Sequence, residues 1–396
     1  MASGGITSPR GFSAGAVSAG IKNSGSPRLD LAILLSEVVC NAAAVFTRNR
    51  VQAAPVIVTR QRLREGKAAA VIVNSGCANA CTGETGMKHA SEMTEIAARH
   101  TGLSPDAVLV ASTGVIGDCL PLNRIRDAVS GIALSVDGGH DFAMAIMTTD
   151  TVPKEAAVTV GGTGFTIGGT AKGSGMIHPD MATLLCFLTT DAAVETAFLN
   201  KALKEAVDIS FNMVSVDGDT STNDMVLFMA NGQARGEMIT EESIHAAAFQ
   251  EALRQLCIRL AREIVRDGEG ATKLIEVTVK GAAALADARQ VARTIVCSPL
   301  VKTAVHGSDP NWGRVITAAG YSGVVLDASK LELEIGGIRL VKNGCPVSFN
   351  HADVVRKLDA SEISIVLDLN LGNVEAVAWG CDMSEEYVTI NSEYTT

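Results

Sequence analysis

Residues Gly168–Ala192 read GGTAKGSGMIHPDMATLLCFLTTDA, and the character of this segment changes at its middle. Glycine-rich turns flank Lys172, whose ammonium can bind a carboxylate or a phosphate as a point charge. The glycine spacing is neither that of a P-loop nor that of a dinucleotide-binding loop. A short polar stretch then leads into an apolar run, which predicts a strand over Thr183–Thr189. On pattern alone, Thr183 is an ordinary first residue of that strand.

Outward from this segment, short apolar runs alternate with stretches of helical periodicity. The runs predict strands over Ala54–Thr59, Ala68–Val73, Ala107–Ala111, Ala156–Val160, Thr183–Thr189, Asp224–Ala230, Leu274–Val279, Ile363–Asp368 and Val374–Ala378. The periodic stretches predict helices over Met87–His100, Leu122–Leu134, Val194–Ile209, Glu241–Arg266 with a break, and Ala282–Thr294. Interleaved helices and strands favour a layered α/β fold. No linker rich in Pro and Ser separates two halves, so any domain division is close-packed.

The composition excludes several classes of function. The chain has 396 residues, of which 47% are hydrophobic and 19% charged, so a large core is available and a mostly disordered chain is excluded. A formal net charge of −10 and a pI of 5.3 argue against binding nucleic acid or an anionic membrane through overall charge. Aromatic residues make up only 4%, which argues against base-stacking surfaces. No apolar run approaches the roughly 18 residues of a membrane helix.

The cysteines and the N-terminal residues point to the same compartment. Nine cysteines are an odd number at scattered positions, which fits no disulfide framework. The closest pair, Cys77 and Cys81, has no matching second pair, so we expect no metal site. Residues Met1–Lys22 lack the continuous apolar segment of a secretory signal. We therefore expect reduced thiols and a cytoplasmic protein.

Two further loops carry small and polar residues at the end or the start of an apolar run. In VLVASTGVIG, Val108–Gly117, the strand ends in Thr113 and Gly114, where backbone N–H groups could hold an oxyanion. An ordinary junction between strand and helix is the alternative. In SVDGDTSTNDM, Ser215–Met225, the acids do not follow the calcium-loop pattern, because Gly218 falls at the wrong position. A rigid, hydrogen-bonded turn is the better interpretation.

Three motifs follow in the C-terminal half. In RDGEGATK, Arg266–Lys273, Glu269 stands between two glycines, and a site carboxylate and a surface turn both remain open. HGSDPNWGR, His306–Arg314, favours a packed loop with internal hydrogen bonds, because the spacing does not place the partners of a catalytic triad. The terminal NSEYTT, Asn391–Thr396, follows a predicted strand over Tyr387–Asn391, and such a polar tail is normally frayed.

Taken together, these motifs resemble those of one family. In chain order they are STGVIG, MTTDT, AKGSGMIHPDMATLLCFLTTDA, SVDGDTSTND, DGEGATK, HGSDPNWGR and the terminal NSEYTT. The series is similar to that of the ornithine acetyltransferase family of arginine biosynthesis, whose members are also called bifunctional glutamate N-acetyltransferases. The resemblance runs from Ile6 to Thr396, and its most specific part is Lys172–Thr183.

The resemblance implies a self-processing enzyme. Members of the family are made as a precursor that cuts itself within the MAT motif, which here is the bond between Ala182 and Thr183. The products are an α chain of residues 1–182 and a β chain of residues 183–396, which share one core and one site. The cut is therefore not a domain boundary. The implied fold is a layered α/β sandwich of the N-terminal-nucleophile type, with Thr183 as the nucleophile.

The resemblance also assigns the remaining site residues. The oxyanion pair falls on the Thr113 hydroxyl and the Gly114 backbone N–H. The substrate-binding positions are Thr148, Lys172, Thr183, Glu269, Asn391 and Thr396. Within MTTDT, the choice of Thr148 over Thr149 is the least certain assignment. No metal or organic cofactor is implied, although some members use acetyl-CoA as a second acetyl donor. The implied partners are N-acetylornithine, glutamate and a second copy of each cleaved chain.

Elementary chemistry fits these roles. A Thr hydroxyl is a weak nucleophile and needs an adjacent base. An α-amine has a pKa of roughly 7.7–8.0, so the amine that cleavage frees on Thr183 can take the hydroxyl proton. The precursor lacks this amine, and we expect it to be inactive as a transferase. The expected reaction is ping-pong: Thr183 takes the acetyl group from N2-acetylornithine, ornithine leaves, and the glutamate amine takes the acetyl group.

Two other classes of protein are the alternatives. An N-terminal-nucleophile amidase or aminopeptidase would cut itself in the same way but would pass the acyl group to water. It would therefore release acetate in the absence of glutamate. A non-enzymatic amino-acid sensor on an α/β scaffold would have no reason to combine Lys172, Thr183, Glu269 and the pair Thr113-Gly114.

Overall fold

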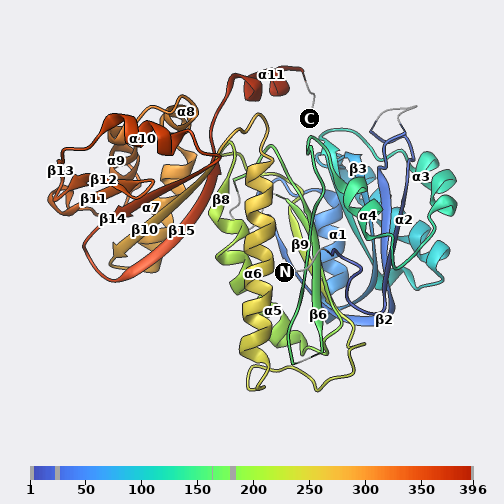
Figure 1. The fold of residues 1–396 in the computed structure, drawn as a ribbon. Helices are drawn as coiled ribbons and strands as arrows, with labels where there is room; N and C mark the ends of the chain where they lie inside the picture. Colours follow the sequence, from blue (N-terminus) through green and yellow to red (C-terminus); the bar gives the residue numbers. More distant parts are fainter. Residues whose placement is uncertain (1–3, 23–26, 163, 179–183, 394–396) are drawn as a thin grey trace.

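The computed structural model of the chain describes residues 4–22, 27–162, 164–178 and 184–393. It contains two β-sheets, each with its own helices (Figure 1). The predicted cleavage residues Ala182 and Thr183 and the predicted ligand Thr396 lie outside the described residues. All nine cysteines are free. Within the described ranges, no group of His, Cys, Asp and Glu side chains is arranged to hold a metal ion, and none of the helices has the length and apolar character of a membrane span.

The strands belong to two sheets, and helices lie between them along the chain. The first sheet contains β1 (Phe12–Val17), β2 (Leu31–Phe46), β3 (Lys67–Cys77), β4 (Val108–Val115), β5 (Lys154–Thr159), β6 (Thr166–Lys172), β7 (Leu185–Thr190) and β9 (Met225–Ala230). The second sheet contains β8 (Val214–Ser215), β10 (Leu274–Ala282), β11 (Glu332–Ile335), β12 (Ile338–Lys342), β13 (Cys345–Pro346), β14 (Glu362–Asp368) and β15 (Val374–Cys381). The α-helices are α1 (Ala54–Arg62), α2 (Gly83–Thr101), α3 (Leu122–Ala128), α4 (Gly139–Ile146), α5 (Thr196–Asp208), α6 (Ala246–Arg266), α7 (Leu285–Cys297), α8 (Pro299–His306), α9 (Trp312–Gly320), α10 (His351–Leu358) and α11 (Glu385–Glu393).

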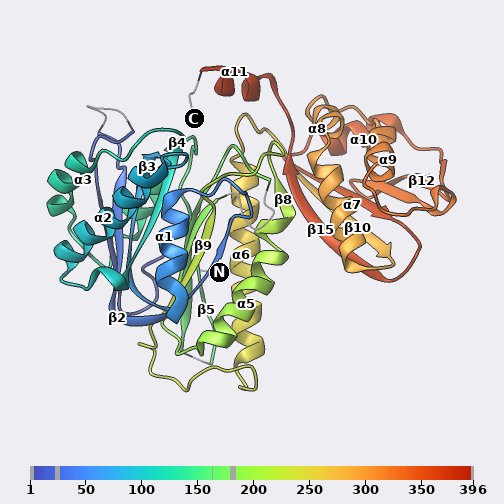
Figure 2. The ribbon, with the colours of Figure 1, turned by 180° about the vertical axis from the view of Figure 1, so that it is seen from behind.

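The first sheet has central strands that are buried on both faces. Its order is β4-β3-β2-β9-β7-β6-β5, with β1 paired to β2. In β7, Leu185 and Phe187 pack in the cluster that includes α4, whereas Cys186 and Leu188 pack in the cluster that includes α5 and α6. A continuous apolar run is the pattern of a strand covered on both sides. The result is a helix–sheet–helix sandwich, seen from opposite sides in Figures 1 and 2.

The strands that precede and follow residues 179–183 in the chain are neighbours in this sheet. β6 ends at Lys172 and pairs antiparallel with β7, where Lys172 lies opposite Leu185. β7 in turn runs parallel to β9, with Leu185 opposite Met225. Strands β9 and β7 of the second predicted cleavage product therefore lie between β2 and β6 of the first in one sheet. The division at Ala182 and Thr183 does not coincide with any boundary between the two sheets.

The second sheet is covered mainly on one face. In β14, Ile363, Ile365 and Leu367 are buried, while Glu362 and Ser364, on the other face, are exposed. This alternation is typical of a half-buried strand. Helix α7 packs against β10 and β15 on the covered face. From β15 the chain returns over the upper end of the first sheet, where α11 lies (Figure 1).

One predicted strand in the N-terminal half is a helix. Residues Ala54–Thr59 form the start of α1, although their β-branched run predicted a strand. Pro55 is compatible with the first turn of a helix, where no partner for its missing N–H is needed. The hydroxyl of Thr59 donates to the Val110 carbonyl oxygen of β4 at 2.6 Å. Packing against the edge of the sheet therefore outweighs the local preference.

The predicted strand over Tyr387–Asn391 is also wrong, because these residues lie in α11. Glu385 and Glu386 occupy the first turn of that helix, where negative side chains stabilise the helix dipole. The other predicted elements are present with shifted ends. Helix α6 is unbroken and begins at Ala246 rather than Glu241.

The packing of α6 on the first sheet predicts a large loss of stability in Phe228→Ala. Phe228 is fully buried in β9, and its ring stacks on Phe249 of α6 with 6.0 Å between the ring centroids. Removing it should lower the free energy of unfolding by about 3–5 kcal/mol, measured by urea denaturation. Val325→Ala, at a side chain that is 89% exposed, is the control and should have almost no effect. Equal stability of the two variants would contradict the observed packing.

Candidate active site

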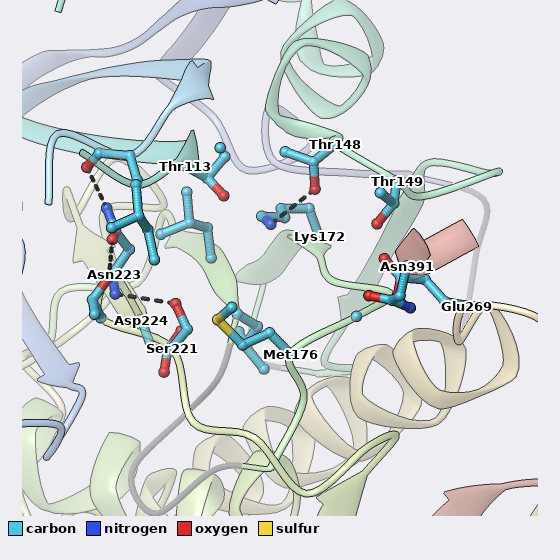
Figure 3. Close-up of a pocket in the computed structure, with 17 residues that line it drawn as sticks. Thr113, Thr148, Thr149, Lys172, Met176, Ser221, Asn223, Asp224, Glu269 and Asn391 are labelled. Atoms are coloured by element: carbon cyan, nitrogen blue, oxygen red, sulfur yellow. Dashed lines mark hydrogen bonds between the residues drawn. The ribbon is translucent and has the colours of Figure 1, made fainter. Parts of the chain in front are cut away.

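A pocket opens at the upper end of the first sheet, where β4 and β6 end and β7 and β9 begin. It is lined by Ala78, Thr113, Gly114, Ile116, Thr148, Thr149, Lys172, Gly175, Met176, Leu184, Leu185, Ser221, Thr222, Asn223, Asp224, Glu269 and Asn391 (Figure 3). Six of the predicted site residues are among them: Thr113, Gly114, Thr148, Lys172, Glu269 and Asn391. They come from segments that are far apart in the sequence, and only the fold brings them together.

Thr113 and Gly114 lie side by side at the end of β4. Gly114 has φ +127°, and a Cβ atom there would lie 2.3 Å from the carbonyl carbon of Gly76 in the neighbouring strand. Only glycine therefore fits without moving the backbone. Thr113 is 7% exposed, and its side chain lies at the pocket (Figure 3). A hydroxyl and an adjacent backbone N–H in a rigid strand end are suitable donors for an oxyanion.

Lys172 brings a positive charge into the pocket from the end of β6. Its Nζ donates to the Thr148 hydroxyl over 3.2 Å (Figure 3). Burial lowers the pKa of Lys172 below its ordinary value, and the charges of Asp150 and Asp224 oppose that shift. Thr149 also lines the pocket, but the hydrogen bond to Lys172 belongs to Thr148. The structure thus distinguishes the two threonines by their contacts.

A buried ion-pair network holds the loop that carries Thr148. Lys154, 2% exposed, lies 2.7 Å from a carboxylate oxygen of Asp150 and 2.6 Å from one of Asp267. Asp150 also accepts hydrogen bonds from the backbone N–H groups of Thr148, at 2.9 Å, and Gly173, at 2.7 Å. Burial opposes the ionisation of Asp150, but Lys154 and these hydrogen bonds outweigh it and hold its pKa at about 2. None of this network was predicted from the sequence.

Glu269 and Asn391 form the opposite wall of the pocket. Asn391 of α11 donates its side-chain N–H to the Glu269 carboxylate over 2.7 Å. The Glu269 backbone N–H donates to the Ser174 carbonyl oxygen at 3.0 Å, and its side chain leaves no room for a Cβ atom on Gly175. Glu269 is 7% exposed, so it is a pocket carboxylate rather than part of a surface turn. The last helix thus reaches the pocket.

Asn223 and its neighbours are pocket residues that the sequence analysis did not assign. The Asn223 amide donates to the carbonyl oxygens of Ala78, at 2.7 Å, and Ser112, at 2.9 Å, and so ties the loop before β9 to β4. The predicted rigid turn over Ser215–Met225 therefore contributes to the site as well. The signal in the sequence was a run of amides and hydroxyls directly before a buried strand, next to the loop at the end of β4.

The second sheet and the helices α7, α8, α9 and α10 form a second lobe. The motif His306–Arg314 lies in this lobe, and none of its residues is among those that line the pocket. His306 pairs through Nδ1 with Asp382 at 2.7 Å, and Asp382 accepts hydrogen bonds from the backbone N–H groups of Thr272 and Lys273. This motif thus joins the second lobe to the segment that leads into α11. It connects the segment that follows Glu269 to the segment that precedes α11.

The roles predicted for Ala182, Thr183 and Thr396 concern residues outside the described ranges. The nearest described residue, Leu184, lines the pocket, and its carbonyl oxygen accepts a hydrogen bond from the Met225 backbone N–H at 2.9 Å. The chain therefore passes from Thr183 directly into a residue of the pocket wall.

Comparison with known proteins identifies the family. The ArgJ family matches residues 13–396. The arginine biosynthesis bifunctional protein ArgJ of Symbiobacterium thermophilum is 54% identical over 397 residues, which cover 99% of each chain. The protein of the same name from Dehalococcoides mccartyi is 52% identical and covers 99% of this chain and 98% of its own.

A solved structure shares the fold. The arginine biosynthesis bifunctional protein ArgJ of Bacillus halodurans has 46% sequence identity and a TM-score of 0.51. The match covers 52% of this chain and 97% of that chain. The layered α/β fold and the family predicted from the motifs are thus confirmed. The chain belongs to the ArgJ family.

Proposed function

We propose that this protein transfers the acetyl group of N2-acetyl-L-ornithine to L-glutamate, giving L-ornithine and N-acetyl-L-glutamate for arginine biosynthesis. One observation carries the proposal: six side chains or backbone groups expected for this reaction, drawn from distant segments, line a single pocket. Relatives that match nearly the whole chain are named for arginine biosynthesis and as bifunctional. We therefore further propose that acetyl-CoA serves as a second acetyl donor to glutamate.

The nucleophile of the proposed reaction is Thr183, freed by cleavage after Ala182. In the precursor the Thr183 hydroxyl attacks the Ala182 carbonyl, and water hydrolyses the resulting ester. The new α-amine then serves as the base for the same hydroxyl. In support, the solved Bacillus halodurans chain is matched over 97% of its length by 52% of this chain, which is close to the length of one of the two expected products.

The geometry of the pocket suits both halves of a ping-pong reaction. When the Thr183 hydroxyl attacks the acetyl carbonyl, negative charge develops on its oxygen, and the Thr113 hydroxyl and the Gly114 N–H would stabilise that charge. The same two donors serve when the glutamate amine attacks the acetyl ester. Lys172 would pair with the α-carboxylate that both amino acids carry, and Glu269 and Asn391 would bind the remaining polar groups of the substrate.

We propose that the cleaved chains remain associated, because the cut leaves the sheet intact. β6 belongs to the first product, whereas its neighbour β7 belongs to the second. Separating them would expose strands that are buried on both faces. Two copies of each chain and a reaction without metal or organic cofactor complete the proposal, as the resemblance implies, together with the cytoplasmic location expected from the cysteines and the N-terminal residues.

Self-cleavage is tested by intact-mass spectrometry of the purified, denatured protein. The wild type should give two masses, for residues 1–182 and 183–396, whereas Thr183→Ala should give one full-length mass. Thr149→Val, which changes another hydroxyl of the pocket, is the matched control and should still be cut. Full transferase activity from an uncut chain would contradict both the nucleophile and its amine base.

The oxyanion role predicts a selective effect of Thr113→Val. The substitution keeps the volume of the side chain and removes one donor, so kcat should fall by about 10²–10³ with little change in KM. Steady-state kinetics with N-acetylornithine and glutamate measure the effect. Release of acetate without glutamate, at the rate of the full reaction, would instead favour a hydrolase.

The contact of Thr148 with Lys172 predicts that the two neighbouring threonines differ. Thr148→Val removes the hydroxyl that accepts from Lys172, and should raise the KM for both amino acids. Thr149→Val leaves that hydrogen bond in place and should change KM less. The reverse order would assign substrate binding to Thr149.

A further inference from the structure

The chain segment just before the predicted cleavage site is tied firmly to a second segment. The backbone N–H groups of Met176 and Ile177 donate to the Asp217 carboxylate at 2.6 and 2.9 Å. The Ile177 carbonyl oxygen accepts from the Val216 N–H at 2.7 Å. Desolvation raises the pKa of Asp217, but these hydrogen bonds oppose the shift and favour the ionised form. Residues 176–178 are thus aligned along residues 215–220 like a short strand.

His178 ends this aligned stretch, and its ring contacts α7. Nε2 lies 3.0 Å from Nη2 of Arg293, and Nδ1 lies 3.2 Å from Sγ of Cys297 and 3.3 Å from Oγ of Ser215. A guanidinium has only donors, so Nε2 is the acceptor, and the neutral ring carries its proton on Nδ1. The His178 carbonyl oxygen also accepts from the Thr220 hydroxyl at 2.8 Å. Both the backbone and the ring of His178 are therefore held.

The residues that hold the His178 ring belong to the second lobe. Arg293 and Cys297 lie on α7, which packs on the second sheet, and Ser215 lies in β8 of that sheet. On the other side of residues 179–183, the Leu184 carbonyl oxygen accepts a hydrogen bond from the backbone N–H of Met225 in the first sheet. The two ends of this five-residue stretch are thus fixed to different sheets, and the predicted scissile bond lies between them.

Self-cleavage requires that the chain be held on both sides of the scissile bond. A hydroxyl attacks a carbonyl efficiently only from a near-attack geometry, and a misplacement of about 1 Å can cost roughly 10²-fold in rate. A stretch of five residues that was fixed at one end only would sample many other geometries. The position of His178 relative to Leu184 therefore limits how the scissile bond is presented.

We propose that Arg293 is a positioning residue for self-cleavage, which holds His178 and thereby lets the second lobe present the scissile bond. The inference rests on the cleavage proposed above and adds a role for the second lobe, whose helices α7, α8, α9 and α10 contribute no residue to the pocket lining. The role is confined to the precursor, because the cut removes the restraint across residues 179–183. Transfer by the cleaved enzyme therefore does not depend on Arg293.

The test follows cleavage of newly made precursor. The chain is synthesised in a cell-free system, synthesis is stopped, and conversion to the two products is followed by denaturing gel electrophoresis. Arg293→Ala should slow the conversion by about 10- to 100-fold. Arg293→Lys, which keeps one cationic donor, should be intermediate. Cys297→Ala should have a smaller effect than Arg293→Ala, because Ser215 still accepts from His178.

A matched control and a second measurement separate positioning from loss of structure. Arg289→Ala removes the same side chain one turn earlier on α7 and should leave the rate of conversion unchanged. Once fully cleaved, Arg293→Ala should show wild-type kcat and KM for transfer. His178→Gln, whose amide can both accept and donate, should be cut faster than His178→Leu.

The possible outcomes are distinguishable. Cleavage of Arg293→Ala at the wild-type rate would overturn the inference. The inference would also be overturned if Arg293→Ala lost transfer activity by the same factor as cleavage rate and melted at a lower temperature. That result would show a merely structural role. A wild-type chain that is never cut would contradict the proposed function itself, and Thr183→Ala identifies that case.

Discussion

The buried ammonium of Lys154 is the interaction on which the arrangement of the site depends. It lies between the carboxylates of Asp150 and Asp267, which are 117 residues apart in the chain. A buried charge that loses its partner is strongly destabilising, so moving either segment away from Lys154 would be costly. Thr148 lies two residues before Asp150, and Glu269 lies two residues after Asp267. One ion-pair network therefore places both walls of the pocket.

The second constraint is the position of β7 inside the first sheet. This strand is buried on both faces and lies between β9 and β6, so it remains in place whether or not the preceding peptide bond is intact. The proposed cut after Ala182, a few residues before this strand, would therefore not release a chain. In the proposed mechanism the sheet gives the nucleophile a rigid support, and the hydrogen bonds of His178 to the second lobe restrain the chain on the other side of the scissile bond.

Local pattern predicted eight of the fifteen strands and five of the eleven α-helices of the described residues, and it failed where neighbours decided the outcome. Ala54–Thr59 has the composition of a strand and is a helix, because it packs across the edge of the sheet at β4. Tyr387–Asn391 is a helix that carries Asn391 to Glu269. The predicted site residues that the structure describes all line the pocket, but the resemblance of the motifs, rather than spacing, had selected them.

The sequence by itself determined the elements that local physics controls: the doubly buried strand after the MAT motif, the glycine at position 114 and the residue types that the chemistry needs. Only the tertiary structure decided which of them meet. Asn391 contacts Glu269 across 122 residues, Lys154 contacts Asp267 across 113, and Arg293 contacts His178 across 115. Such contacts depend on desolvation and exact distance, neither of which is encoded in local periodicity or propensity.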